Sequence, residues 1–404
     1  MPSATPKLPA KNGVPTNAPT GWQVVPLGGI AEIASGITLG RPLRDKPTRR
    51  VPYLRVANVK DGWLDLDDVY EIDATDEEIK KCRLRYGDIL LTEGGDPDKL
   101  GRGTFWQEQI AECVHQNHIF RVRLPSDRFC YDFVSLQIGS PHGKAYFFAQ
   151  AKQTTGIATI NRGVLNRFPL LVPPLPEQRR IAAHLREQLA GVAQARAATE
   201  AQADGLGKLI HALLRESLSS RKAIAHRLAD CLSEVSEGVG EKWEEYPVLG
   251  ATRAGLAMAK EPVGKNPGRY KPVRPGTIFY NPMRILLGSI AMIDDENPPG
   301  ITSPDYVAMR CIEGHLHPRR FYYWFRSRYG AEFIKSMTRG AVRERLMFRR
   351  LAPASISIPD WPTQVAVAAK LVEIKQAKLA LAVKLTALER LPAALLREAF
   401  SGRI

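Results

Sequence analysis

Two long stretches of the chain repeat the same spacing of apolar residues. In residues 359–401 apolar side chains recur at steps of three and four: Val367, Leu371, Ile374, Leu381, Leu385, Leu388 and Leu395. Residues 174–219 follow the same rule with a weaker middle: Ile181, Leu185, Val192, Ala195, Leu206, Leu209 and Leu213. Such a seam predicts an amphipathic helix that needs a helical partner. A helix of about 40 residues is roughly 60 Å long.

The two stretches also share landmarks at both ends. Pro176 and Gln178 lie 186 positions before Pro362 and Gln364, and the run ALLRE at 212–216 returns 182 positions later. Prolines open both stretches, and proline suits the first turn of a helix. We therefore expect two copies of one helical element that pack antiparallel against each other. Two unrelated amphipathic helices are the alternative.

Short strands and turns occupy the remainder of the chain. Residues 22–172 predict strands over 51–59, 86–92 and 118–124 and a helix over 129–148. Residues 221–358 repeat this order. Arg-Pro-Gly-Thr-Ile at 274–278 matches Arg-Tyr-Gly-Asp-Ile at 85–89, and the aromatic residues 321, 323 and 325 lie 192 positions after 129, 131 and 133.

These patterns predict an α+β fold in which two pseudo-repeated domains, each α+β, are separated by two long helices that form an antiparallel coiled coil. The expected divisions are a disordered arm (1–21), a first domain (22–172), a central helix (173–220), a second domain (221–358) and a C-terminal helix (359–404). The arm is rich in proline and alanine and has no apolar periodicity.

Charge narrows the class of partner. The 404 residues carry a formal net charge of +15, which predicts an anionic partner, either nucleic acid or a membrane surface. No window of 18 apolar residues and no secretion signal is present, so we expect no membrane span. The five cysteines are scattered and odd in number, which is typical of a reduced, cytoplasmic protein.

Catalytic motifs are missing from the sequence. Asn281-Pro282 and Asn297-Pro298-Pro299 resemble part of an adenine methyltransferase loop, but neither is followed by the aromatic residue that would stack on a flipped base. There is no phosphate-binding GxxxxGK[ST] loop and no methyl-donor loop. Cys113, His115 and His118 have no second ligand cluster at zinc spacing. We expect no enzymatic activity, no cofactor and no metal.

Basic and amide side chains on loops are the remaining candidates for function. The predicted DNA-binding residues of the first domain are Arg41, Arg44, Lys46, Arg49, Arg50, Lys99, Arg102, Thr155, Asn161 and Arg162. Those of the second domain are Lys265, Asn266, Arg269, Lys271, Arg284, Arg339, Arg343 and Arg345. Lysine and arginine contact phosphates, whereas arginine and asparagine also read guanine and adenine. Any single residue among them could equally be a solvated surface group.

The order of these motifs resembles the DNA-specificity subunit of type I restriction-modification systems. The resemblance rests on the opening WQVVPLG at 22–28, the strand YGDIL at 86–90, TTG at 154–156 ahead of PPLPEQ at 173–178, and LLREAFSG at 395–402. It covers nearly all of the chain after residue 21. The second copy departs from the pattern, because Thr363 stands where the first copy has Glu177.

The resemblance implies a specific function. Each target recognition domain would read one half of a split, asymmetric site in double-stranded DNA, and the paired helices would set the distance between the halves. The chain itself would be non-catalytic. It would carry two copies of a methyltransferase subunit and, through that complex, the ATP-dependent restriction subunits. The alternatives are the specificity chain of a type II-like assembly and a coiled-coil adaptor that binds no DNA.

Overall fold

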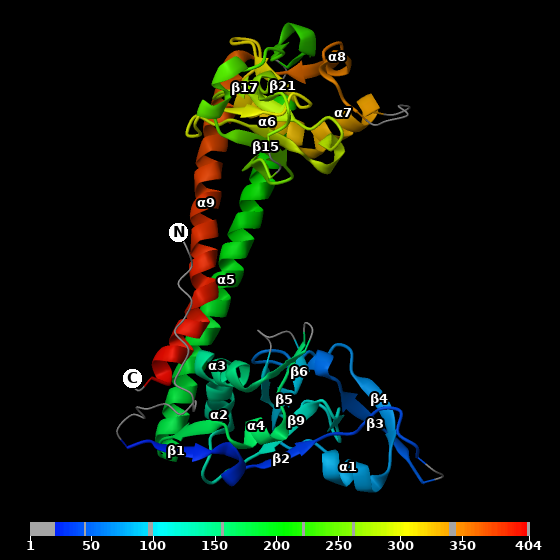
Figure 1. Cartoon of the computed structure of the whole chain (residues 1–404), viewed down its shortest axis with the longest axis vertical. Helices are drawn as coiled ribbons and strands as arrows, with labels where there is room; N and C mark the ends of the chain where they lie inside the picture. The colour runs from blue at the N-terminus through cyan, green and yellow to red at the C-terminus, as the bar shows by residue number, and fades with distance from the viewer. Residues whose placement is uncertain are drawn as a thin grey trace. The chain divides into compact units, whose positions relative to one another are not determined.

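The computed structural model describes residues 21–43, 46–95, 100–154, 157–219, 223–260, 263–338 and 345–401. The predicted disordered arm therefore lies outside the described residues, apart from Gly21. The chain divides into two compact units (Figure 1): Met1–Ala197 with Thr386–Ile404, and Ala198–Leu385.

In the described ranges, the first unit contains short strands and four short α-helices. The strands are β1 (Gln23–Pro26), β2 (Glu32–Ser35), β3 (Arg49–Leu54), β4 (Tyr70–Ala74), β5 (Ile89–Thr92), β6 (Gly94–Gly95), β7 (Gly103–Phe105), β8 (Val114–His115), β9 (Ile119–Arg123), β10 (Lys152–Thr154), β11 (Ile157–Thr159) and β12 (Pro169–Val172). The helices are α1 (Asp76–Cys82), α2 (Tyr131–Ile138), α3 (Pro141–Gln150) and α4 (Arg162–Asn166). The predicted helix over 129–148 is thus two helices, because Ser140 caps a new helix that begins at Pro141.

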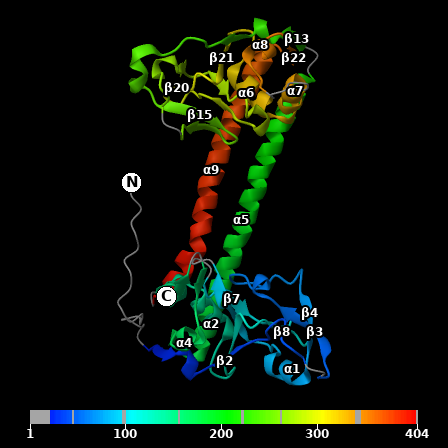
Figure 2. The same cartoon turned by 45° about the vertical axis from the view of Figure 1, so that its right-hand side comes forward.

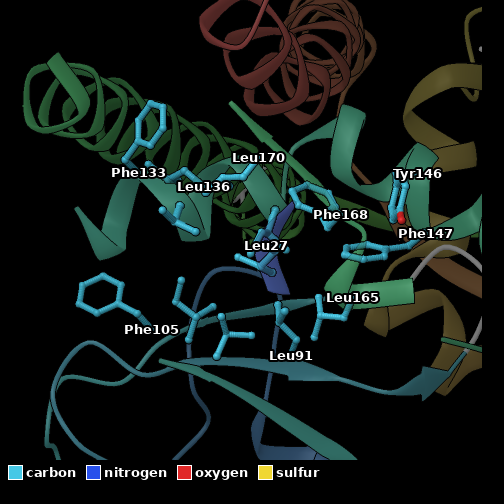
Figure 3. Packing of buried hydrophobic residues seen from close by; sticks show 14 of the residues in the cluster. Leu27, Leu91, Phe105, Phe133, Leu136, Tyr146, Phe147, Leu165, Phe168 and Leu170 are labelled. Atoms are coloured by element: carbon cyan, nitrogen blue, oxygen red, sulfur yellow. The ribbon is translucent and has the colours of Figure 1, made fainter. Parts of the chain in front are cut away.

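The sheets of the first unit are antiparallel except where β3 meets β8. The central sheet has the order β2-β9-β5-β7, a second sheet has the order β4-β3-β8, and β1 pairs with β12. The main core lies between the central sheet and the helices. Figure 3 shows Leu27, Leu91, Phe133 and Phe168 converging there. Alternate residues of β5 and β9 face this core, and Leu90 and Ile119, on the opposite face of these strands, belong to a smaller core, so these two strands are buried on both faces.

The second unit repeats this topology. Its strands are β13 (Ile224–Arg227), β14 (Leu232–Glu234), β15 (Val248–Thr252), β16 (Gly255–Met258), β17 (Lys271–Val273), β18 (Ile278–Tyr280), β19 (Ile290–Met292), β20 (Gly300–Thr302), β21 (Val307–Cys311) and β22 (Ser355–Ile358). Its helices are α6 (Pro318–Arg326), α7 (Arg328–Thr338) and α8 (Phe348–Leu351). The sheet β14-β21-β18-β19 corresponds to β2-β9-β5-β7, and the pair β13-β22 corresponds to β1-β12.

Two long helices, α5 (Leu175–Leu218) and α9 (Trp361–Ala399), confirm the prediction from the apolar seam. They lie side by side in both views (Figures 1 and 2). Within the first unit, Leu185 of α5 shares a core with Phe400 just after α9, and Arg196 further along α5 lies 4.0 Å from Glu389. Residue numbers rise along one helix as they fall along the other, so the two helices are antiparallel there.

Of the fourteen predicted seam positions, six are buried, seven are half-buried and one is exposed. Ile181, Leu185, Leu371 and Ile374 are buried. The last turns of α5 differ, because Leu209 is 45% exposed and Leu214 is buried instead of the predicted Leu213. The reason is that this end of α5 packs on the core of the second unit, so its buried stripe turns toward that core.

A buried glutamine fixes the start of each long helix. The Oε1 atom of Gln178 accepts a hydrogen bond from the Cys130 backbone N–H (2.9 Å), and its Nε2 donates to the carbonyl oxygens of Arg128 (3.2 Å) and Pro173 (2.9 Å). These bonds join the helix to the segment that precedes α2. The glutamine that the two sequence copies share therefore has a structural role, because it anchors the first turn of the long helix.

Gln364 makes the equivalent set of bonds in the second unit. Its Oε1 accepts from the His317 backbone N–H (2.9 Å), and its Nε2 donates to the carbonyls of His315 (3.0 Å) and Pro359 (2.9 Å). Glu177, which the second copy lacks, forms only an exposed ion pair with Arg180. Such a pair stabilises little, which is consistent with its loss from the second copy.

Candidate nucleic-acid interface

Two loops lie side by side at one end of the central sheet in the first unit. One loop joins β5 to β7, and the other contains the β10–β11 hairpin. They are held together because β11 pairs with β6, and because the Ile160 N–H donates to the Glu93 carbonyl oxygen at 2.9 Å. Ile160 itself is buried, so it anchors the second loop in the core.

The second unit holds the equivalent loops by the same backbone contact. The Leu346 N–H donates to the carbonyl oxygen of Pro282 at 3.2 Å, and Leu346 is buried as Ile160 is. The loop after β18 contains a 3-10 turn over Ile285–Leu287 that ends at a left-handed Gly288. Both units therefore present a matched pair of loops at the same end of the sheet, which gives the repeat a common candidate surface.

Four predicted residues of the first unit have accessible polar ends. Lys46 and Arg162 are exposed, and Arg50 is exposed with a loose 3.4 Å contact to Glu71. Arg102 is half-buried at the end of the β5–β7 loop, and its buried Nε atom has no hydrogen-bond partner among the described residues. The exposed ends of Lys46, Arg50 and Arg162 are accessible to an incoming phosphate, whereas the Nε atom of Arg102 is not.

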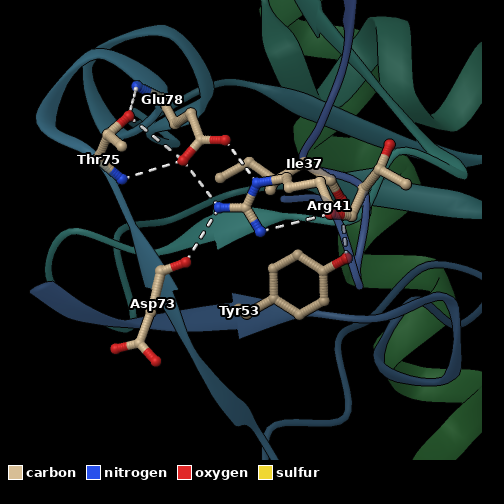
Figure 4. Close-up of polar contacts among 7 residues, drawn as sticks. Ile37, Arg41, Tyr53, Asp73, Thr75 and Glu78 are labelled. Atoms are coloured by element: carbon tan, nitrogen blue, oxygen red, sulfur yellow. Dashed lines mark hydrogen bonds and ion pairs between the residues drawn. The ribbon is translucent and has the colours of Figure 1, made fainter. Parts of the chain in front are cut away.

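Arg41, a predicted DNA-binding residue, makes hydrogen bonds within the first unit when no DNA is bound. Its Nε and Nη2 atoms contact the two carboxylate oxygens of Glu78 at 2.5 and 2.7 Å, and Nη2 also donates to the Asp73 carbonyl (Figure 4). Glu78 in turn accepts the Thr75 N–H in the capping box of α1. This network ties the loop after β2 to α1, so Arg41 is a structural cross-link in the unbound state.

The Arg41–Glu78 pair predicts an acid-dependent loss of stability. The hydrogen bonds from Arg41 lower the pKa of Glu78 from 4.5 to about 2. Because the folded pKa lies below the unfolded value, the stabilisation is present above about pH 4.5 and is lost as the pH falls toward 2. Urea unfolding of wild type and Glu78→Gln across this range should show their stabilities converging as the pH falls. The exposed neighbour Glu77→Gln should track wild type, and parallel curves for Glu78→Gln and wild type would contradict the assignment.

Two other predicted residues are also engaged within the first unit. Arg49 forms ion pairs with Glu112 (2.7 Å) and Asp76 (3.1 Å), and these hydrogen bonds raise its pKa. Asn161 caps α4, because its side-chain oxygen accepts the Val164 N–H at 2.9 Å. A contact from either residue to DNA would require it to exchange these partners.

Five predicted DNA-binding residues of the second unit are exposed, and a sixth, Lys271, is half-buried. Lys265, Asn266 and Arg269 are exposed on the segment before β17. Lys271 is half-buried, its Nζ donates to the Tyr306 carbonyl at 2.7 Å, and burial lowers its pKa. Arg284 and Arg345 are exposed on the two paired loops and make no ion pair among the described residues.

Exposed apolar side chains accompany these two arginines, and the sequence analysis missed them. Met283 is 62% exposed and Leu287 is 70% exposed on the loop after β18, and Met347 is exposed on the partner loop. Large apolar residues on a basic loop can contact thymine methyl groups or base edges. In the sequence, their exposure was indicated only by the position of Met283 and Leu287 close to Arg284, between two strands of apolar residues.

Five predicted residues, Arg44, Lys99, Thr155, Arg339 and Arg343, lie outside the described residues. In the part of the chain that the structure covers, no group of three histidine, cysteine or acidic side chains could hold a metal ion. No helix in the described ranges is long and apolar enough to cross a membrane.

Comparisons with known proteins agree with this arrangement. Residues 19–190 match the family described as the type I restriction modification DNA specificity domain. The chain is 22% identical over 290 residues to a putative type I restriction enzyme MjaX specificity subunit of Methanocaldococcus jannaschii, a match that covers 69% of this chain and 66% of that protein. It is 24% identical over 141 residues to the EcoKI specificity subunit of Escherichia coli, covering 34% of this chain and 30% of that protein. The matches thus span less than two thirds of these curated relatives.

Solved structures show the same fold over nearly the whole chain. The HsdS subunit from Thermoanaerobacter tengcongensis superposes with a TM-score of 0.59 at 16% identity, covering 96% of this chain and 99% of that one. A chain from a type I restriction-modification system superposes with a TM-score of 0.64 at 18% identity, covering 96% and 100%.

Proposed function

We propose that this chain is a DNA-specificity subunit of a type I restriction-modification system, the family that its residues 19–190 match, and that its two units each read one half of a bipartite, asymmetric DNA site. The proposal rests on one observation: the two units share a topology, but the side chains on their paired loops differ. The same paired loops, joined by the same backbone hydrogen bond, are present in both units. A repeated scaffold with different side chains is suited to two different half-sites.

The loop chemistry supports unlike half-sites. The first unit offers Arg102 and Arg162 beside its paired loops, whereas the second offers Arg284 and Arg345 with the exposed Met283. Arginine reads guanine through two parallel hydrogen bonds, and apolar side chains favour thymine. Lys46, Arg50, Lys265 and Arg269 lie further from these loops in sequence and suit phosphate contacts, which position a protein without reading sequence.

The long helices suit a scaffolding role in the complex. Apolar side chains on α9 remain in contact with solvent, among them Val383 (72% exposed) and Leu379 (50% exposed). Exposed apolar residues on a helix favour association with further helices. We infer that the helices hold the methyltransferase subunits, two copies of which would bring the restriction subunits, and that the chain contributes recognition without catalysis.

Replacing both Arg284 and Arg345 with glutamine should weaken binding of the cognate duplex and relax discrimination at the second half-site only. Each lost arginine–guanine contact should cost about 1–3 kcal/mol. Binding is measured by fluorescence anisotropy on duplexes with single substitutions in either half. Lys378→Gln, which removes one exposed charge from α9, is the control and should bind like wild type. A uniform loss across all substituted duplexes would show that the arginines contact phosphate only.

A further inference from the structure

The two units differ at one corner of their central sheets. The strand register pairs Ile89 with Val122 in the first unit and Ile278 with Met309 in the second. Asp88 and Thr277 therefore occupy equivalent positions just before the strand. Arg123 and Arg310 occupy equivalent positions on the neighbouring strand.

This corner of the first unit is closed by an ion pair. Arg123 donates from Nε and Nη2 to the two carboxylate oxygens of the buried Asp88, each at 2.7 Å. The same carboxylate accepts the Arg85 N–H at 2.7 Å. These hydrogen bonds raise the pKa of Arg123, so its guanidinium stays charged and is paired with a carboxylate of the same unit.

The second unit lacks the carboxylate at this corner. Thr277 keeps the turn, since its Oγ1 accepts the Arg274 N–H at 3.1 Å, but it offers Arg310 no charge. The Nε atom of Arg310 is buried and has no hydrogen-bond partner among the described residues. Burial and then the charge of Arg274 lower the pKa of Arg310, and the charge of Glu237 opposes them only in part, so the net shift is opposite to that of Arg123.

A cavity of about 380 Å³ opens at this corner. Arg274, Arg310 and His317 line it on the polar side, and Trp361 and Val365 at the start of α9 line it on the apolar side. The Nδ1 atom of His317 is buried without a partner among the described residues, and its ring lies 5.7 Å from the Trp361 ring. Glu313 is the acidic residue of the lining, and it is exposed. The cavity therefore carries two guanidinium groups against one carboxylate.

We propose that this cavity binds a carboxylate presented by an acidic polypeptide segment. A carboxylate already satisfies the equivalent arginine in the first unit, and the planar guanidinium donates to it through two parallel bonds. The indole and valine side chains suit the apolar part of a peptide. DNA is the less favoured occupant, because the cavity lies where β18 begins, whereas the loop that carries Arg284 follows the other end of this strand.

The test is titration of the full chain with a blocked tetraglutamate peptide, followed by tryptophan fluorescence and by calorimetry. Wild type should bind the peptide with a fluorescence change that Trp361→Phe removes. Thr277→Asp, which restores the internal carboxylate, and Arg310→Gln should each weaken binding roughly tenfold or more. Lys242→Gln, an exposed charge removal in the same unit, should bind like wild type. If circular dichroism shows that Thr277→Asp does not fold, Arg310→Gln decides the outcome.

Two results would overturn the proposal. One is wild-type affinity for the peptide in Thr277→Asp and Arg310→Gln. The other is displacement of the peptide by inorganic phosphate or a short nonspecific duplex whose own affinity falls in the same variants, which would make the cavity a phosphate site. Recognition of the cognate DNA half-sites should be unchanged in both variants, so this inference can fail independently of the proposed function.

Discussion

Alanine in place of Gln178 should lower the free energy of unfolding by roughly 2–4 kcal/mol, because it leaves one buried N–H and two carbonyl oxygens without partners. The side chain is 1% exposed and makes three hydrogen bonds that join α5 to the segment before α2. Chemical denaturation followed by circular dichroism measures the change. Gln364→Ala should have a similar effect through the second unit, since its three bonds are equivalent.

Matched controls separate this effect from helix propensity. Gln194 on α5 and Gln376 on α9 are exposed, so their replacement by alanine should change stability by less than about 0.5 kcal/mol. If Gln178→Ala were as stable as Gln194→Ala, the shared glutamine would have no anchoring role. The repeated Pro-x-Gln pattern would then need another explanation.

Exchanging residues 22–172 for the same region of another specificity subunit should replace one half of the recognised site and leave the other half intact. The physical reason is that the loops held by Ile160 and Glu93 belong wholly to the first unit. The paired loops of the second unit keep their own anchor at Leu346. The sequence methylated by a complex containing the chimaera is the measurement.

The reciprocal exchange of residues 221–358 is the control for this prediction. It should change the opposite half-site and leave the first one as in wild type. Altered bases in both halves after either exchange would mean that the two units read DNA jointly, which would contradict independent recognition.

The architecture could be predicted because its signals are local and repeated. A seam of apolar residues at steps of three and four specifies a long helix wherever it occurs, and α5 and α9 confirm it. The matching order of strands and turns predicted the repeat. The break between α2 and α3 was missed, although Gly139, Ser140 and Pro141 carry the local signals of a helix end, an N-cap and a first-turn proline.

The roles of single charged residues could not be predicted, because their partners are distant in sequence. Arg41 was grouped with DNA-binding residues, yet its guanidinium is held by Glu78, 37 positions away. Arg123 and Arg310 are alike in sequence, and only the register of β5 and β18 shows that a carboxylate stands beside the first and a threonine at the same position beside the second. Burial and pairing decide which arginines are free, and both depend on tertiary structure.

Sequencing of methylated bases in a host that expresses this chain with its methyltransferase subunits tests the central claim most directly. The account predicts one split motif, with two unlike halves separated by a gap of fixed length. A single continuous motif, or two identical inverted halves, would contradict recognition by two different units of one chain.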